Sequence, residues 1–421
     1  MDYRESLDYL YGLQKFGIKL GLDNILHILG RLHHPDRAYP IVHVAGSNGK
    51  GSVCAGLSSI LIQAGRRTGL YSSPHLHSFT ERIRIDGQAI SETEAVALIE
   101  SVRAVCDGIP VTFFEFTTAM ALLHFKHQEV DVAILEVGMG GRLDATNAVQ
   151  PAVTVITPIC LDHSEHLGAD LTSISAEKAG IIKPKIPLVV GQQQPAALQV
   201  INSRAKELQA PVVCYGRDFT VKTVDNGFDY QGIGLSLTGL KSGLHGVHQH
   251  HNLGVALATA ELLQRQGLDL PTISLQDGVA AARWPGRLEW WQEERTVLLD
   301  GAHNEGGAKV LAAYLESLSV AGIRWVVGAK ATKDIANILS PVLPLVDSLY
   351  CTVPPVEEAI PAESIAQIAV EAGVQACCFG DLASALTAAL ADRQQGEIVM
   401  VAGSLFLVAA AREYLMTLEG A

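Results

Sequence analysis

A glycine-rich loop near the N-terminus constrains the fold of this 421-residue chain more than any other feature. Residues 46–52 (GSNGKGS) follow a short apolar run, residues 41–45, and precede a segment with apolar positions at helical spacing. This order predicts a strand, a loop and a helix, whose first backbone N–H groups form an anion site that Lys50 can complete at the β- and γ-phosphates of a nucleotide. Val44 and Gly51 break the strict G-x-x-x-x-G-K-[ST] pattern, so a plain glycine turn stays open as the alternative.

Further short apolar runs alternate with helical patterns, which predicts a mostly parallel sheet. Residues 130–135 and 152–157 are two such strand-like runs, rich in Val and Ile. Between residues 218 and 246 the pattern changes to a β-meander, with Asn226-Gly227 as its turn. We therefore expect an α/β fold whose N-terminal P-loop-type domain has a mostly parallel sheet and a β-rich insertion.

A second series of alternating strands and helices begins near Arg295 and predicts a smaller Rossmann-like α/β domain. The boundary lies within residues 283–294 (RWPGRLEWWQEE), where Pro and Gly interrupt the periodicity. The expected domains are residues 1–287 and residues 288–421.

Charge and cysteine content exclude several classes of protein. The 31 Lys and Arg against 44 Asp and Glu give a net charge of -13, and no basic run is present, which argues against a nucleic-acid partner. Seven scattered cysteines show neither a disulfide framework nor metal-type spacing and fit a reducing compartment. Without a signal peptide or a long apolar stretch, the sequence predicts a soluble, cytoplasmic protein with no membrane partner.

Two strand ends carry groups suited to metal binding. Glu136 precedes a glycine-rich loop (VGMGGRLD), where open α/β sheets place ligands, and Mg²⁺ favours one or two carboxylates with phosphate oxygens. Glu136 could equally be an ion-pair partner, and Arg142 and Asp144 could form a surface pair. After the next strand, His163 and His166 could share a helical face as zinc ligands, contact Mg²⁺ or phosphate, or cap a helix, although no H-E-x-x-H pattern supports zinc.

Two further segments are ambiguous by pattern alone. Lys178 lies in an apparently helical stretch (AEKAG), where an exposed lysine is the default interpretation. Residues 300–304 (DGAHN) join a strand to a helix, so their polar side chains can face a ligand, or Asn304 can simply cap the helix.

Taken in chain order, nine segments resemble the folylpolyglutamate synthase and dihydrofolate synthase family, which is related to the Mur ligases. The resemblance covers nearly the whole chain, and nine motifs in family order are much more specific than any one of them. The segments are GSNGKGS (46–52), SSPHL (72–76), FFEFTTAMAL (113–122), LEVGMGGRLDATN (135–147), LDHSEHLG (161–168), AEKAGIIKP (176–184), HQHHN (248–252), PGRLE (285–289) and DGAHN (300–304).

The resemblance implies a role for each matching residue. The expected ATP contacts are Asn48, Gly49, Lys50, Gly51, Ser52, Asn252, Arg287 and Asp300. The expected ligands of two Mg²⁺ ions are Ser73, Glu136 and His163, with Lys178 carbamylated and His303 close to the reaction centre. The expected pterin or folate contacts are Leu20, Gly21, Phe114, Glu115, Arg142, Leu143 and Asp144.

The implied activity is an ATP-dependent carboxylate–amine ligase that adds L-glutamate to dihydropteroate and to the γ-carboxylates of reduced folates through an acyl phosphate. The resemblance also leads us to expect a monomer with only small-molecule substrates. The alternatives are a folylpolyglutamate synthase alone, a Mur-type ligase acting on a UDP-sugar substrate, or a P-loop GTPase, although no N-K-x-D base-reading motif follows the loop.

Overall fold

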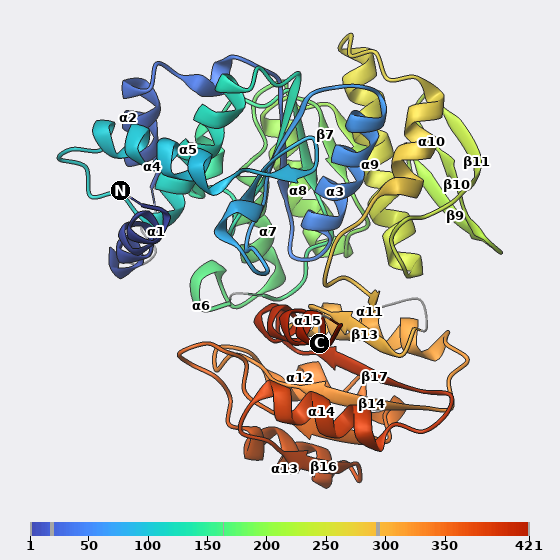
Figure 1. Ribbon diagram of the computed structural model, residues 1–421. Helices are drawn as coiled ribbons and strands as arrows, with labels where there is room; N and C mark the ends of the chain where they lie inside the picture. The colour runs from blue at the N-terminus through green and yellow to red at the C-terminus, as the bar shows by residue number, and fades with distance from the viewer. Residues whose placement is uncertain (1, 17–20, 163, 292–294, 420–421) are drawn as a thin grey trace. The chain divides into compact units, whose positions relative to one another are not determined.

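The structure, a computed structural model, describes residues 2–16, 21–162, 164–291 and 295–419 (Figure 1). The chain divides into two compact units, the first formed by residues 1–243 and 249–283 and the second by residues 244–248 and 284–421. Each unit is built around its own β-sheet with helices on both faces, which confirms the predicted fold class.

The first unit contains an eight-stranded sheet in the order β4-β3-β2-β5-β1-β6-β7-β8. Six of these strands are parallel, whereas β3 and β4 form an antiparallel edge. The strands are β1 (Ile41–Ala45), β2 (Thr68–Tyr71), β3 (Ile83–Ile85), β4 (Gln88–Ala89), β5 (Val132–Glu136), β6 (Val153–Ile156), β7 (Leu188–Val190) and β8 (Val212–Cys214). β1 and β5 are buried along their whole length, as expected for parallel strands covered on both faces.

Helices cover both faces of this sheet (Figure 1). One face packs against α1, α2, α4 and α5 beside β2, β5 and β1, and against α7 and α8 beside β6 and β7. The opposite face is covered by α3, against which α10 packs. The helices are α1 (Tyr3–Gly12), α2 (Asp23–Arg31), α3 (Lys50–Gln63), α4 (Glu92–Val105), α5 (Phe113–His127), α6 (Ser164–Leu167), α7 (Leu171–Ala179), α8 (Pro195–Glu207), α9 (Val247–Arg265) and α10 (Thr272–Ala281).

The predicted meander is a separate three-stranded antiparallel sheet made of β9 (Thr220–Val224), β10 (Gly227–Gln231) and β11 (Ser236–Leu240). The predicted Asn226-Gly227 turn is wrong by one residue. Val224 pairs with Gly227, so the two turn residues are Asp225 and Asn226. Gly227 is the first strand residue, and a Cβ there would lie 2.0 Å from the carbonyl oxygen of Leu240 on β11.

The second unit contains a six-stranded sheet in the order β12-β13-β17-β14-β15-β16, parallel except for β12. Its strands are β12 (Glu289–Trp291), β13 (Val297–Asp300), β14 (Gly322–Val327), β15 (Ser348–Cys351), β16 (Gln375–Cys378) and β17 (Glu397–Ala402). The helices α11 (Glu305–Glu316), α12 (Ile335–Leu339) and α13 (Ala362–Glu371) pack on one face, and α14 (Leu382–Asp392) and α15 (Leu405–Glu419) pack on the other. Within the described ranges, no helix has the length and apolarity needed to cross a membrane.

Candidate functional site

The glycine-rich loop connects β1 to α3, as predicted. Gly46 has a φ of 151°, and a Cβ there would lie 1.8 Å from Thr157 Oγ1. Gly49 has a φ of 86°, and a Cβ there would lie 2.5 Å from Asn252 Oδ1. Both positions therefore need glycine, because a side chain would be strained and would collide with neighbouring elements. The loop presents the first turn of α3, whose N–H groups lack intrahelical acceptors and can bind an anion.

Two lysines converge on this loop. Lys50 Nζ donates hydrogen bonds to the carbonyls of Gly46 and Ser47 at 3.1 and 3.3 Å. Lys178 Nζ on α7 donates to the same Gly46 carbonyl at 2.9 Å. Lys178 is only 4% exposed, so the default expectation of an exposed lysine is wrong. Burial, and then the positive charge of Lys50, lower the pKa of Lys178 to about 7.

Glu136 and Ser73 meet at the carboxyl ends of the neighbouring strands β5 and β2. Glu136 is the last residue of β5 and is buried, and its Oε2 accepts a hydrogen bond from the Ser73 backbone N–H at 3.4 Å. The third predicted metal ligand, His163, lies outside the described residues. In the described part of the chain, no three His, Cys, Asp or Glu side chains form a metal cluster. A buried carboxylate and a serine suit Mg²⁺, which takes few protein ligands and completes its shell with phosphate oxygens and water.

The loop after β5 is held from inside by the carboxylate of Asp144. Asp144 Oδ2 accepts from the backbone N–H groups of Gly138 and Met139 at 3.1 and 3.0 Å. Asp144 Oδ1 accepts from the backbone and the hydroxyl of Thr146 at 3.0 and 2.5 Å. Burial raises the pKa of Asp144, while these hydrogen bonds act in the opposite direction.

Arg142, in the same loop, pairs with α7. Its guanidinium forms an ion pair with Glu177 Oε1 at 2.8 Å, and its backbone N–H donates to the Glu177 carbonyl at 2.8 Å. The suggested surface pair between Arg142 and Asp144 is therefore wrong, because each residue has a different partner. Leu143 lies between them and is partly exposed.

The start of α5 lies against this loop. Phe114 fills the space beside Gly138, where a Cβ would come within 2.5 Å of its ring, and its ring centroid is 5.9 Å from that of Tyr71. Glu115 is buried and caps the helix, since its Oε2 accepts from the Thr112 backbone N–H at 2.8 Å. The same oxygen accepts from Asn24 Nδ2 at 3.3 Å, which links α5 to α2.

Within the second unit, a compact group of polar residues lies at the end of β13. Asp300 is buried and accepts from the backbone N–H groups of Leu288 and Ala302 at 2.8 and 2.9 Å. Burial raises the pKa of Asp300, and the charge of Arg287 opposes that shift. His303 Nδ1 lies 2.8 Å from the Gly301 carbonyl, which can only accept, so Nδ1 carries a proton. Asn304 caps α11 through a 2.8 Å bond from the Gly307 N–H, which confirms that interpretation.

Comparisons with known proteins identify the family of this chain. Residues 44–260 match the Mur ligase middle domain, and residues 289–413 match the C-terminal domain of dihydrofolate synthetase. The chain is 37% identical over 410 residues to the dihydrofolate synthase/folylpolyglutamate synthase of Escherichia coli, covering 97% of this chain and 94% of that protein. The chain belongs to the dihydrofolate synthase/folylpolyglutamate synthase family.

Solved structures of family members are also similar. The E. coli FolC structure in complex with DHPP and ADP has a TM-score of 0.93 and 34% identity, and covers 100% of this chain and 99% of that one. The Yersinia pestis bifunctional enzyme complexed with AMPPNP and Mn ion has a TM-score of 0.90 and 37% identity, and covers 99% of this chain and 98% of that one.

The first unit brings together most of the residues that the family pattern had suggested. The glycine-rich loop (residues 46–52), Lys178, Glu136 and Ser73 lie at the carboxyl ends of parallel strands or on the helices that follow them. Asn252 on α9 is buried, and its Nδ2 donates to Gln249 Oε1 at 2.9 Å. Gly21 is partly exposed beside the start of α2, whereas Leu20 lies outside the described residues. Arg287 and Asp300 belong to the second unit.

One buried cation near Glu136, Arg82, was not predicted from the sequence. Arg82 is buried, donates from Nε to His75 Nδ1 at 2.8 Å, and places its guanidinium 5.2 Å from the ring centroid of Phe113. Burial lowers the pKa of Arg82, and the nearby Glu136 has the opposite effect. The sequence contains no isolated signal for Arg82, because it follows Thr80 and Glu81 in a polar segment and its burial is visible only in the structure.

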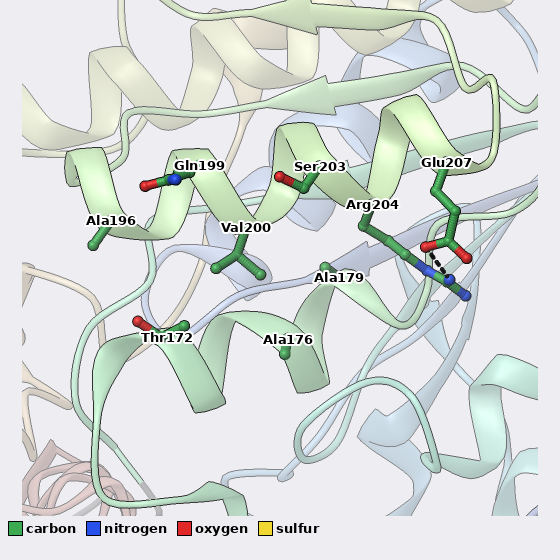
Figure 2. Close-up of a pocket in the computed structure, with 9 residues that line it drawn as sticks. All are labelled: Thr172, Ala176, Ala179, Ala196, Gln199, Val200, Ser203, Arg204 and Glu207. Atoms are coloured by element: carbon green, nitrogen blue, oxygen red, sulfur yellow. Dashed lines mark hydrogen bonds and ion pairs between the residues drawn. The ribbon is translucent and has the colours of Figure 1, made fainter.

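A surface pocket of about 480 Å³ lies between α7 and α8 (Figure 2). Ala176 and Ala179 line it from α7, and Gln199 and Ser203 line it from α8, with the Arg204–Glu207 ion pair at one end. It contains none of the predicted site residues. Lys178, on the same helix as Ala176 and Ala179, is instead buried against the glycine-rich loop.

Proposed function

We propose that the protein is an ATP-dependent ligase that joins L-glutamate to dihydropteroate, forming dihydrofolate, and to the γ-carboxylate of reduced folates. The observation that carries this proposal is that Lys50 and Lys178 both bind the Gly46 carbonyl, while Glu136 pairs with Val44 on β1, two residues before the loop, in a chain of this family. This set of groups suits the transfer of a phosphoryl group to a carboxylate.

The reaction proceeds in two steps. The acceptor carboxylate attacks the γ-phosphorus of ATP, the bond to the β,γ-bridging oxygen breaks, and ADP leaves. The amine of glutamate then attacks the acyl phosphate and expels inorganic phosphate, forming the amide and releasing a proton. Lys50 and the N–H groups at the start of α3 stabilise the charge that develops on the phosphate oxygens. The loop residues Asn48, Gly49, Gly51 and Ser52 hold the triphosphate.

Ser73, Glu136 and His163 are the proposed ligands of two Mg²⁺ ions. When bound, Mg²⁺ offsets the repulsion between the acceptor carboxylate and the triphosphate. The chain itself supplies a buried carboxylate at Glu136, oriented by the backbone of Ser73.

Lys178 is proposed to carry a carbamate. Its neutral amine attacks the carbon of CO₂, so a C–N bond forms while one C=O π bond opens and leaves its electron pair on oxygen, and the nitrogen then releases its proton to water. Only the neutral amine has the required lone pair, and a pKa of about 7 keeps a large share of the amine neutral at physiological pH. The product exchanges a cation next to Lys50 for an anion, which removes the repulsion between the two side chains.

The acceptor is proposed to bind at the loop after β5 and the start of α5. Phe114 offers an aromatic face to the pterin ring, and Arg142 offers a cation that is exposed apart from its pair with Glu177. The proposed contacts are Leu20, Gly21, Phe114, Glu115, Arg142, Leu143 and Asp144. Asn252, Arg287 and Asp300 are proposed to contact ATP, and His303 is proposed to act near the reacting groups.

The test is glutamate-dependent ADP release by the purified protein with Mg²⁺-ATP, using dihydropteroate in one reaction and tetrahydrofolate in the other. Release with both acceptors is expected. Release with tetrahydrofolate alone would restrict the protein to folylpolyglutamate synthesis, and no release with either acceptor would favour a Mur-type ligase. A hydroxamate trap for the acyl phosphate tests the mechanism separately.

We further propose that the enzyme acts as a cytoplasmic monomer. All seven cysteines are free thiols, which fits a reducing compartment. Sedimentation at working concentration tests the monomer, and a second boundary of twice the mass would contradict it.

A further inference from the structure

A buried histidine on β1 is joined to Asp144 through a single hydroxyl group. His43 is fully buried, and its Nε2 lies 2.8 Å from Thr146 Oγ1. Thr146 Oγ1 lies 2.5 Å from Asp144 Oδ1. Thr146 is fully buried and Asp144 is almost so, and together the three side chains form one polar chain inside the first unit.

The direction of both hydrogen bonds follows from the chemistry of the groups. A carboxylate oxygen can only accept, so the Thr146 hydroxyl donates to Asp144. The Thr146 oxygen must then accept its other bond, so His43 donates from Nε2. Burial lowers the pKa of His43 to about 3, so the ring is neutral and its Nδ1 has a lone pair.

Packing alone does not account for this histidine. No donor in the described part of the chain reaches His43 Nδ1, which leaves a buried acceptor unsatisfied and destabilises the fold. The other four residues of β1 are apolar and equally buried. An apolar side chain at position 43 would avoid the unsatisfied nitrogen, so the feature that distinguishes histidine here is the N–H group aimed at Thr146.

We propose that His43 is a positioning residue for the acceptor site. Its N–H holds the Thr146 hydroxyl in the orientation that donates to Asp144, and the Asp144 carboxylate in turn holds the N–H groups of Gly138 and Met139. His43 does not touch the acceptor and acts only through Thr146. The inference rests on the proposed binding of the acceptor at this loop.

Loss of the His43 N–H should disturb the loop after β5 more than it disturbs nucleotide binding. Without the N–H at position 43, the Thr146 hydroxyl has no fixed donor and can rotate away from Asp144. The carboxylate then loses one of its four hydrogen bonds, and the backbone of residues 138–144 is held less firmly. Residues 46–52 bind the phosphates through other groups, so the affinity for ATP should change little.

The experiment compares His43→Leu with His43→Gln. Leu removes both the N–H donor and the unsatisfied nitrogen, whereas the Gln amide can place an N–H near the position of Nε2. We expect His43→Leu to raise the KM for dihydropteroate roughly tenfold and the KM for ATP less than about twofold, with no loss of thermal stability. His43→Gln should restore the dihydropteroate KM to within about threefold of wild type. An unchanged dihydropteroate KM in His43→Leu, or equal increases in both KM values with a lower melting temperature, would overturn the proposal.

Two controls separate this role from packing. Thr154 pairs with His43 in the sheet, is equally buried, and donates instead to the Pro187 carbonyl at 3.1 Å, so Thr154→Val should leave the dihydropteroate KM unchanged. In a Thr146→Val background, His43→Leu should have no further effect, because the bond that links His43 to Asp144 is already gone. Full additivity of the two changes contradicts the relay.

Asp144→Asn distinguishes failure of the inference from failure of the proposed function. If Asp144→Asn raises the dihydropteroate KM and His43→Leu does not, the relay is wrong and the acceptor site stands. If neither changes that KM, the acceptor binds elsewhere and both proposals fall.

Discussion

Lys50 and Lys178 donate hydrogen bonds to the same carbonyl oxygen, that of Gly46, at 3.1 and 2.9 Å. Two ammonium groups so close together repel each other, and only the half-buried Lys50 retains contact with solvent. Burial, followed by the positive charge of Lys50, lowers the pKa of Lys178 to about 7. The lowered pKa of Lys178 therefore affects both the stability of the fold and the chemistry proposed at the glycine-rich loop.

The first prediction concerns stability against pH. Because the folded pKa of Lys178 is about 7 and the unfolded value is near 10.5, the unfolded state binds more protons between these limits. The free energy of unfolding should rise with pH from about 7 to 10, by up to about 1.4 kcal/mol per unit from this group in CO₂-free buffer. Denaturant unfolding at pH 7, 8 and 9 measures this contribution.

The comparison for that series is Lys178→Met. It should lose the pH-dependent contribution, be at least as stable as wild type at pH 7, and lose turnover. Lys206→Met, at an exposed position on α8, should behave like wild type in both respects. A Lys178→Met protein with the wild-type pH slope would show that Lys178 is not the source of this pH dependence.

The second prediction separates backbone strain from a specific collision. Gly49 and Gly216 have nearly equal φ values of 86° and 82°, so alanine should destabilise the fold at either position by about 1 kcal/mol. A Cβ at Gly49 would also lie 2.5 Å from Asn252 Oδ1, whereas a Cβ at Gly216 meets nothing within 4 Å. Gly49→Ala should therefore weaken ATP binding at least tenfold, in calorimetry, while Gly216→Ala should leave it intact. Equal ATP affinities in the two variants would remove Gly49 from the nucleotide site.

The third prediction concerns the charged groups of phosphoryl transfer. Lys50→Met and Glu136→Gln should each lower kcat by about a hundredfold or more, because both side chains are proposed to stabilise charge that develops in the transition state. Glu136→Gln should also raise the Mg²⁺ concentration needed for half-maximal activity. The exposed Glu92→Gln on α4 is the control for loss of a carboxylate. Near-normal turnover in either Lys50→Met or Glu136→Gln contradicts the assigned roles.

The strand–loop–helix unit was predictable from sequence because glycine at residues 46 and 49 and apolar periodicity on either side are local signals. The burial of Lys178 could not be predicted, since a lysine inside α7 has the same local sequence pattern whether it faces solvent or the glycine-rich loop. The partner of Asp144 was also hidden, because backbone N–H donors leave no mark in the sequence.

His43 and Arg82 were missed for a related reason. His43 is a single polar residue in an apolar strand, whereas Arg82 follows Thr80 and Glu81 in a polar segment before β3, and neither is informative until its three-dimensional partners are known. The strand-end pattern already marked Glu136 as a candidate metal ligand and the resemblance to a family supplied Lys178, whereas the structure supplied the groups that surround them. The boundary of the meander turn was missed because Asn-Gly is a strong signal for a turn at those two residues, although here Gly227 is needed by the neighbouring strand.

The last prediction concerns the ion pair between Arg142 and Glu177. The Arg142 side chain is more than half exposed, so the pair should contribute less than about 1 kcal/mol to stability. If Arg142 contacts the acceptor, Glu177→Gln should change the KM for dihydropteroate by about twofold to fivefold, because it frees the guanidinium, and Arg142→Ala should raise that KM more strongly. Glu207→Gln is the matched control, since Glu207 forms an exposed 2.8 Å ion pair with Arg204 at the surface pocket between α7 and α8. The measurements are steady-state kinetics with varied dihydropteroate and denaturant unfolding of the three variants. An unchanged dihydropteroate KM in Arg142→Ala would remove this residue from the acceptor site. A changed dihydropteroate KM in Glu207→Gln would indicate that any charge lost near α7 has the same effect.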